Sequence, residues 1–152
     1  MSVENNRACV ERYVAAFNSG DLDAAAECFA HDACNFGRSV GRQGIRRVLE
    51  DIRQTFPDAK LETIDVVAAG DWVVERGYFS GTHLGVGKLP VNGGLPVGVP
   101  PTRRTFRVNH VHMYRIRDAK IADHYGLRDD LGMMQQLGLL PSAQRGPDVP
   151  TK

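Results

Sequence analysis

The sequence predicts a single α+β domain in which helices come first and a mainly antiparallel sheet follows. Apolar residues recur at helical spacing over roughly the first third of the chain, whereas from Lys60 onward the pattern is typical of strands. The later strands follow one another closely, which favours antiparallel neighbours. At 152 residues the chain has the usual size of one domain, with residues 1–140 as the domain and 141–152 as a loose C-terminal tail.

Three helices are expected before the sheet. The first covers residues 4–18, whose apolar side chains fall on one helical face and which a Ser-Gly pair follows. The second covers residues 22–29, with an aspartate before it as a cap. The third covers residues 42–56 and stops at Pro57. Between the second and third helices, residues 34–37 are expected to form a brief strand or turn.

Four strands and a closing amphipathic segment are expected in the second half. Residues 60–70 and 71–83 form one predicted pair, and residues 105–116 and 120–127 form another. Between the pairs, residues 85–101 contain five glycines and four prolines among 17 positions. A loop of this kind is either functional, such as a lid, or a tolerated surface insertion. The closing segment covers residues 131–140.

Composition excludes several classes of protein. The chain is 42% hydrophobic and 24% charged with a net charge of +1, and its arginines are interspersed with acids, so no nucleic-acid partner is expected. No apolar run reaches the roughly 18 residues of a membrane span, and the amino terminus lacks an apolar signal core. Cys9, Cys28 and Cys34 are odd in number and lack CxxC spacing, which indicates reduced thiols in a cytoplasmic protein.

The chemistry that the sequence could support is concentrated in the predicted hairpin of residues 105–127. Alternate residues of a strand share a face, so His110, His112 and Tyr114 are expected to point the same way. The returning strand carries the ionisable residues Asp123 and His124. Imidazole beside a carboxylate, or beside a second imidazole, in an apolar cavity suits general acid–base chemistry near neutral pH.

The group that lies opposite His112 depends on the turn, and the sequence permits two registers. A two-residue loop sets Tyr114 opposite Asp123, and Asp123 then shares a face with His112. A three-residue loop sets His112 opposite His124. Neither loop contains the residues that its usual turn prefers. Local rules therefore leave the register open, but either one brings an ionisable partner within cross-strand reach of His112.

Two alternatives to acid–base chemistry remain at this point. In the first, the histidines only hydrogen-bond and fill the sheet. In the second, His110 and His112 bind a metal with His124 or His83 as a third ligand, although no carboxylate partner of the usual kind stands out. Phosphate-binding loops, a serine nucleophile elbow, HExxH and a dinucleotide fingerprint are absent from the sequence. No cofactor and no metal are therefore expected.

Five stretches, taken in order, resemble the SnoaL-like polyketide (ester) cyclase family. They are VAAFNSGD, GTHLG, VPPTRRTF, VHMYRIRDAKIADHY and DDLGMMQQLG, and they extend the resemblance to about Leu140. The combination is more specific than any single piece. The resemblance implies the cone-shaped α+β barrel shared with nuclear transport factor 2 and ketosteroid isomerase. In that fold three N-terminal helices close over a strongly curved, mainly antiparallel sheet and leave a deep apolar pocket.

The resemblance also implies a function and a set of site residues. Members of the family close a ring in a polyketide ester by a cofactor-free intramolecular aldol reaction, using an aspartate, a histidine on the neighbouring strand and an asparagine near the second helix. Carried over by position, the histidine is His112 and the asparagine is Asn35. The other expected pocket positions are Phe17, Val48, His110, Tyr114, His124 and Gly126. A small hydrophobic molecule is the expected partner. Folds of this type often dimerise through the outer sheet face, so a homodimer or a higher homo-oligomer is expected.

The family's aspartate is missing from its expected position, because the run Asp123-His124-Tyr125-Gly126 ends in glycine there. Three interpretations follow. Asp123 or His124 takes over the role, the protein catalyses a related reaction such as polyketide hydroxylation, or the fold only binds a small ligand. The leading expectation is an enzyme that cyclises a polyketide-type or cyclic carbonyl substrate, with His112, Asp123 and His124 as its catalytic residues.

Overall fold

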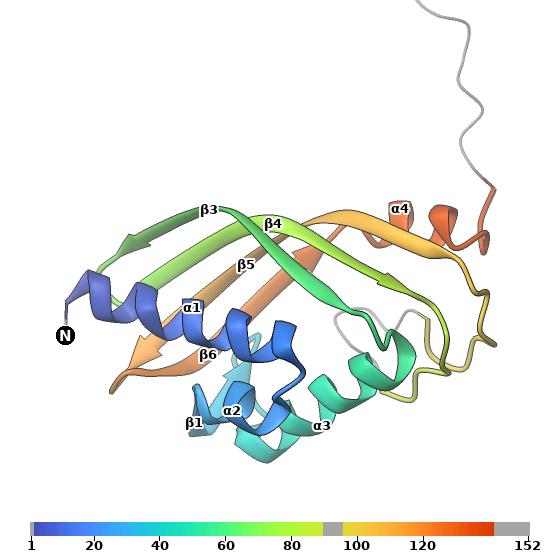
Figure 1. The fold of residues 1–152 in the computed structure, drawn as a ribbon. Coiled ribbons are helices and arrows are strands. Elements are labelled where there is room, and N and C mark those ends of the chain that lie inside the picture. Colours follow the sequence, from blue (N-terminus) through green and yellow to red (C-terminus); the bar gives the residue numbers. More distant parts are fainter. Residues whose placement is uncertain (1, 90–95, 142–152) are drawn as a thin grey trace, which may run out of the picture.

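The computed structural model describes residues 2–89 and 96–141 and confirms the α+β architecture (Figure 1). Three N-terminal helices lie beneath a curved six-stranded sheet, and a short fourth helix lies beside β5 at one end of it. The elements in chain order are α1 (Val3–Ser19), α2 (Leu22–Glu27), β1 (Phe29–Asn35), β2 (Arg38–Ser39), α3 (Gly41–Thr55), β3 (Lys60–Ala69), β4 (Trp72–Thr82), β5 (Thr105–Arg117), β6 (Lys120–Arg128) and α4 (Asp130–Gln136).

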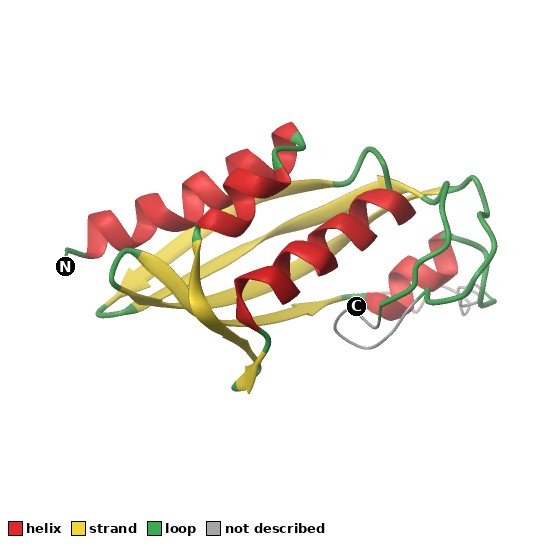
Figure 2. Ribbon diagram, turned by 90° about the horizontal axis from the view of Figure 1, so that it is seen from below, coloured by secondary structure: helices red, strands yellow, loops and turns green. Residues whose placement is uncertain are grey.

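The sheet is mainly antiparallel, as expected, and has the strand order β2-β1-β6-β5-β4-β3. One neighbouring pair, β1 with β6, is parallel. The sheet curves strongly but stays open, with β2 and β3 as its edges. Figure 2 views the concave side and shows the helices lying over this face of the sheet. The concave face and the helices together enclose the core.

Helix α1 follows its predicted range within one residue at each end. The Ser2 side chain accepts a hydrogen bond from the backbone N–H of Asn5, which caps the helix start. Gly20 ends the helix with a φ of 82°, a left-handed conformation that glycine adopts without steric cost. The apolar stripe of the helix carries Tyr13 and Phe17, both of which are buried against the sheet.

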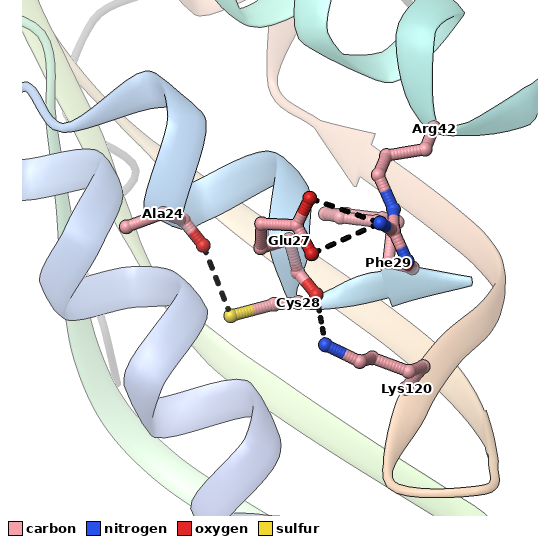
Figure 3. A network of polar contacts seen from close by, with 6 residues as sticks. All are labelled: Ala24, Glu27, Cys28, Phe29, Arg42 and Lys120. Carbon is pink, nitrogen blue, oxygen red and sulfur yellow. Dashed lines mark hydrogen bonds and ion pairs between the residues drawn. The ribbon is translucent and has the colours of Figure 1, made fainter. Parts of the chain in front are cut away.

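The second helix ends two residues earlier than predicted, and the chain then enters a longer strand than expected. Arg42 holds this junction: its guanidinium donates to both carboxylate oxygens of Glu27 at 2.9 Å and to the carbonyl of Phe29 at 2.9 Å. Lys120 donates to the Glu27 carbonyl from the other side (Figure 3). Phe29 therefore starts β1 and pairs with Ile121 of β6 instead of continuing α2.

The hairpin of β5 and β6 has a register that differs from both predictions. Its two-residue turn pairs Arg117 with Lys120. The turn residues Asp118 and Ala119 have φ values of 52° and 57°, the conformation that such tight hairpins require. The extra residue Ala122 then forms a bulge, because Ile116 pairs with Ile121 but Arg115 pairs with Asp123. The loop length in the first predicted register is thus correct, but the strand pairing beyond the bulge is wrong in both.

The described part of the glycine- and proline-rich loop is attached to α3. The buried carboxylate of Asp51 accepts hydrogen bonds from the backbone N–H of Lys88 at 2.9 and 3.1 Å and from that of Leu89 at 3.0 Å. Residues 90–95 of the loop and 142–152 of the predicted tail lie outside the described residues. The three cysteines are free, and within 2–89 and 96–141 no helix could span a membrane.

Candidate active site

A cavity of about 220 Å³ lies between the helices and the concave face of the sheet. Most of its wall is apolar, and apart from Tyr13 of α1 its polar side chains come from β1, β5 and β6. The lining residues are Tyr13, Phe17, Phe29, Asn35, Val40, Ile45, Val48, Leu49, Ile52, Leu61, Phe79, His110, His112, His124 and Arg128. Six of the residues that the sequence singled out for the site are therefore brought together here.

Three histidines form a continuous cluster on the sheet wall of the cavity. The ring centroids of His110 and His112 lie 4.5 Å apart, and those of His112 and His124 lie 4.9 Å apart. His112 thus occupies the centre of the cluster. The cluster depends on the bulge at Ala122, because that extra residue turns His124 toward the same face as His112 and sets Gly126 opposite His112.

Asn35 orients the third histidine of the cluster. Its Oδ1 lies 3.0 Å from Nδ1 of His124, and the two residues are direct partners in the parallel pairing of β1 with β6. The amide oxygen can only accept, so this contact requires the proton of a neutral His124 on Nδ1. Nε2 of His124 is then an unprotonated nitrogen, and it is buried without a hydrogen-bond partner among the residues that the structure describes.

Burial keeps all three imidazoles neutral at physiological pH. It lowers the pKa of His110 to about 4, helped by the charge of Arg128. Burial also lowers the pKa of His124 to about 4, and the nearby Asp123 only partly offsets this effect. The pKa of His112 is lowered well below its usual 6.5, first by burial and then by its two histidine neighbours. A neutral imidazole is the form that can accept a proton.

A buried carboxylate lies behind His112, and the sequence interpretation missed it. Glu75 on β4 is directly opposite His112 on β5 and is fully buried. It accepts hydrogen bonds from the hydroxyl groups of Thr63 and Tyr114, the latter at 3.2 Å. The Tyr114 hydroxyl is in turn 3.0 Å from Nδ1 of His112. The sequence does contain a signal for it, because Glu75 is two positions after the apolar Val73 in β4 and so faces the same, inward side of the sheet.

Asp123 lies on the opposite face of β6 from the cavity. Its carboxylate accepts hydrogen bonds from the Tyr125 hydroxyl at 2.8 Å and from the backbone N–H of Gly37 at 3.3 Å. The expectation that Asp123 shares a face with His112 is therefore wrong, and the bulge is the reason. Among the described residues that line the cavity, none is a carboxylate.

Tyr114, Gly126 and Arg128 complete the surroundings of the histidines. Tyr114 is fully buried behind the cluster, with its ring stacked on that of His124 at 5.2 Å between centroids. Gly126 leaves the position opposite His112 without a side chain. Arg128 brings a guanidinium to the cavity wall and is ion-paired with Asp130. In the part of the chain that the structure describes, no group of three or more His, Cys, Asp or Glu residues is arranged to hold a metal ion.

Comparison with known proteins gives consistent relatives. Residues 7–137 match the family described as SnoaL-like polyketide cyclase. The chain is 35% identical to nogalonic acid methyl ester cyclase of Streptomyces nogalater over 131 residues, which are 82% of this chain and 91% of the relative. It is 34% identical to aklanonic acid methyl ester cyclase DauD of Streptomyces sp. (strain C5) over 136 residues, 85% of this chain and 79% of the relative.

Solved structures agree with this assignment. TsrD from Streptomyces laurentii superimposes with a TM-score of 0.78 at 28% identity, over 92% of this chain and 99% of that one. AclR from Streptomyces galilaeus, a candidate hydroxylase, also superimposes with a TM-score of 0.78, at 25% identity over 95% of this chain and 87% of that one.

Proposed function

The chain belongs to the SnoaL-like polyketide cyclase family, and we propose that it closes a ring in a polyketide-type ester by an intramolecular aldol reaction. The two curated relatives are named for reactions on nogalonic and aklanonic acid methyl esters. The reaction takes place in the cavity beneath the sheet, and the substrate is a small, largely apolar molecule with carbonyl groups. The predominantly apolar lining suits such a molecule.

The observation that carries the proposal is the set of unpartnered imidazole nitrogens on the cavity wall. Both ring nitrogens of His110 and Nε2 of His124 are buried and have no hydrogen-bond partner among the described residues. Leaving a buried polar atom unpaired costs about 1–3 kcal/mol. A substrate whose carbonyl or hydroxyl groups pair with these nitrogens recovers that cost, which favours polar groups on one side of an otherwise apolar ligand.

His112 is the proposed catalytic base because it lies at the centre of the cluster and is neutral. It removes a proton from the carbon between two carbonyl groups of the substrate, and the electron pair of that bond remains on the substrate as an enolate. The enolate carbon attacks a second carbonyl group in the same molecule and forms the new carbon–carbon bond. The resulting alkoxide takes the proton back from His112, so the product has the same atoms as the substrate.

The remaining wall residues position the substrate in this proposal. Asn35 fixes His124, which hydrogen-bonds a substrate oxygen through Nε2 when that oxygen carries a proton. Arg128 provides positive charge on the cavity wall, which stabilises the enolate electrostatically. Phe17 and Val48 belong to the apolar helix side of the cavity and hold the substrate against the histidines.

The test is turnover of nogalonic and aklanonic acid methyl esters by the purified protein, followed by liquid chromatography and mass spectrometry. Cyclisation gives a product of unchanged mass and altered retention. We expect His112→Asn to lower kcat by about 100-fold or more, the usual size of a general-base effect. Asp123→Asn is the discriminating variant, because its outward position predicts little change. Equal turnover by wild type and His112→Asn would contradict the proposed role of His112.

A related hydroxylation is the second candidate, and Gly126 favours it. The glycine removes the side chain that the family's aspartate would place opposite His112, and AclR at 25% identity is itself a candidate hydroxylase. Hydroxylation requires dioxygen and a two-electron reductant, one oxygen atom entering the product and the other leaving as water. With both supplied, the same mass measurement separates the two functions, since only hydroxylation adds one oxygen atom to the substrate. Stoichiometric binding of an ester in calorimetry without any product would instead favour a binding protein.

We also propose a homodimer formed through the convex face of the sheet. Val111 and Met113 of β5 and Leu127 of β6 expose large apolar side chains there, and Leu127 is 71% exposed. Neighbouring exposed apolar groups on one face are typical of surfaces that a partner covers. A second copy of the chain would bury them.

A further inference from the structure

Glu75 is a fully buried carboxylate with no part in the mechanism described above. Its two oxygens are occupied separately: Thr63 from β3 donates to Oε1 and Tyr114 from β5 donates to Oε2 at 3.2 Å. A carboxylate that accepts from two hydroxyl groups has the hydrogen-bonding pattern of its ionised form. The Tyr114 hydroxyl, 3.0 Å from Nδ1 of His112, connects this charge to the centre of the histidine cluster.

The hydrogen bonds that join Glu75, Tyr114 and His112 determine which nitrogen of His112 carries the proton. A tyrosine hydroxyl has a single proton. When Tyr114 donates that proton to Glu75, its oxygen can only accept from His112, and Nδ1 of His112 must be protonated. Nε2 is then the unprotonated nitrogen of a neutral imidazole, which is the nitrogen that a general base needs.

From this geometry we propose that Glu75 and Tyr114 are positioning residues that hold His112 in its Nδ1–H form and receive its proton during the reaction. The inference rests on the proposed aldol function for its catalytic step. As Nε2 takes the substrate proton, the Nδ1 proton passes to the Tyr114 oxygen and the Tyr114 proton passes to Glu75. His112 and Tyr114 end neutral, Glu75 becomes a neutral acid, and the negative charge resides on the substrate enolate. Protonation of the alkoxide reverses each transfer.

This transfer solves an energetic problem of the apolar cavity. A neutral His112 whose pKa is lowered well below 6.5 is a weak base, and a buried imidazolium next to two further histidines would be unfavourable. Burial raises the pKa of Glu75, although its hydrogen bonds from Thr63 and Tyr114 partly oppose this. A more basic carboxylate on Glu75, the last of these three hydrogen-bonded residues, therefore makes Nε2 of His112 a stronger base toward the substrate.

The groups around Glu75 and His112 come from each of the elements that pack against them. Thr63 contacts Glu75 from β3, and Tyr13 of α1 packs its ring against that of Tyr114 at 5.9 Å between centroids. The charged and titratable groups facing His112 are those of His110 from the same strand and of His124 and Arg128 from β6. These neighbouring groups all disfavour an imidazolium at His112. The acidic group on the other side is Glu75, which accepts the hydrogen bond of Tyr114, the hydrogen-bond partner of His112.

The first test measures the tautomer of His112 in the wild-type protein and needs no substrate. Two-bond ¹H–¹⁵N correlation spectra of ¹⁵N-histidine-labelled protein distinguish the protonated ring nitrogen from the unprotonated one, and a His112→Gln spectrum assigns the signals. We expect Nδ1 protonated and Nε2 unprotonated near neutral pH. An Nε2–H form as the main species would overturn the proposal.

Variants distinguish the proposed hydrogen-bond role of Tyr114 and Glu75 from a role in packing alone. Tyr114→Phe removes the acceptor of the Nδ1 proton and should move the tautomer ratio toward Nε2–H by about tenfold or more, the effect of one buried hydrogen bond. Tyr125→Phe is the matched control, because it removes a tyrosine–carboxylate hydrogen bond on the convex face. It should leave the His112 signals unchanged. Unchanged signals in a folded Tyr114→Phe protein would also overturn the proposal.

Glu75→Gln tests the proton transfer itself. The amide keeps an acceptor for Tyr114 but removes the charge, so we expect kcat for the ester substrates to fall by about 100-fold with little change in KM. The decline of kcat in acid that reports Glu75 ionisation should disappear from its pH profile. Unchanged kcat would contradict the inference. If the wild type converts neither ester, the proposed function fails, while the tautomer spectra still decide whether Glu75 and Tyr114 position His112.

Discussion

Acid should destabilise this protein through His124 in particular. Its pKa is about 4 in the folded chain, against a usual value of 6.5 that applies to the unfolded chain. As the pH falls below 6.5, the unfolded state therefore takes up a proton that the folded state does not accept. The free energy of unfolding falls across this interval and stops falling on account of His124 below about pH 4.

The size of the effect follows from the two pKa values. Between about pH 7 and about pH 4.5 the loss attributable to His124 is about 2.5 kcal/mol. With a urea m-value of about 2 kcal/mol/M, typical of a chain of this length, the unfolding midpoint moves by about 1 M. Carboxylates and the other buried histidines add to the acid sensitivity of the wild type, so the contribution of His124 must be isolated by a variant.

Urea unfolding of wild type and His124→Gln at both pH values measures that contribution. The variant should lose about 2.5 kcal/mol less than the wild type over the interval, whatever its stability near neutral pH. His31→Gln, on an exposed position of β1, is the matched control and should follow the wild type. Parallel losses in wild type and His124→Gln would refute the assignment of a strongly lowered pKa to His124.

Three further predictions concern the cavity, the loop and the convex face. Gly126→Asp places a carboxylate opposite His112 at about 5 Å and should raise the pKa of His112, measured by NMR titration. An unchanged pKa would contradict the strand register. Asp51→Asn weakens the hydrogen bonds to the N–H groups of residues 88–89 and should lower the free energy of unfolding by about 1–2 kcal/mol in thermal or urea melts. An unchanged stability would show that this attachment contributes little. Leu127→Lys should convert a dimer to monomers in analytical ultracentrifugation, and a dimer that persists would place the interface elsewhere.

The helices and most strands could be predicted because their residues repeat with a local period. The apolar stripe of α3 fixes the position of Ile45 and Leu49 on the buried side, and both are in the core. The end of α2 could not be located in the same way. The chain there is held by Arg42 and by the pairing of Phe29 with β6, contacts with residues that lie far from α2 in the sequence.

The hairpin register required knowledge that no local pattern contains. Ala122 has no feature that marks it as a bulge, and the bulge shifts every side chain beyond it to the other face. Its position agrees with the pairing of Asn35 to His124, which joins two distant parts of the chain. The location of Glu75 was easier to predict from the sequence, because a charged residue among the inward-facing positions of β4 indicates a buried partner, here Tyr114.

The parallel pairing of β1 with β6 also determines when the cavity can form during synthesis. Asn35 and His124 are 89 positions apart, so the nascent chain carries β1 long before its partner strand leaves the ribosome. Contacts of such separation slow folding, because the intervening chain must close a long loop first. Until β6 is made, β1 lacks the strand it pairs with in parallel and the cavity lacks the wall that carries His124. A chaperone or aggregation would act on the chain at this incomplete stage.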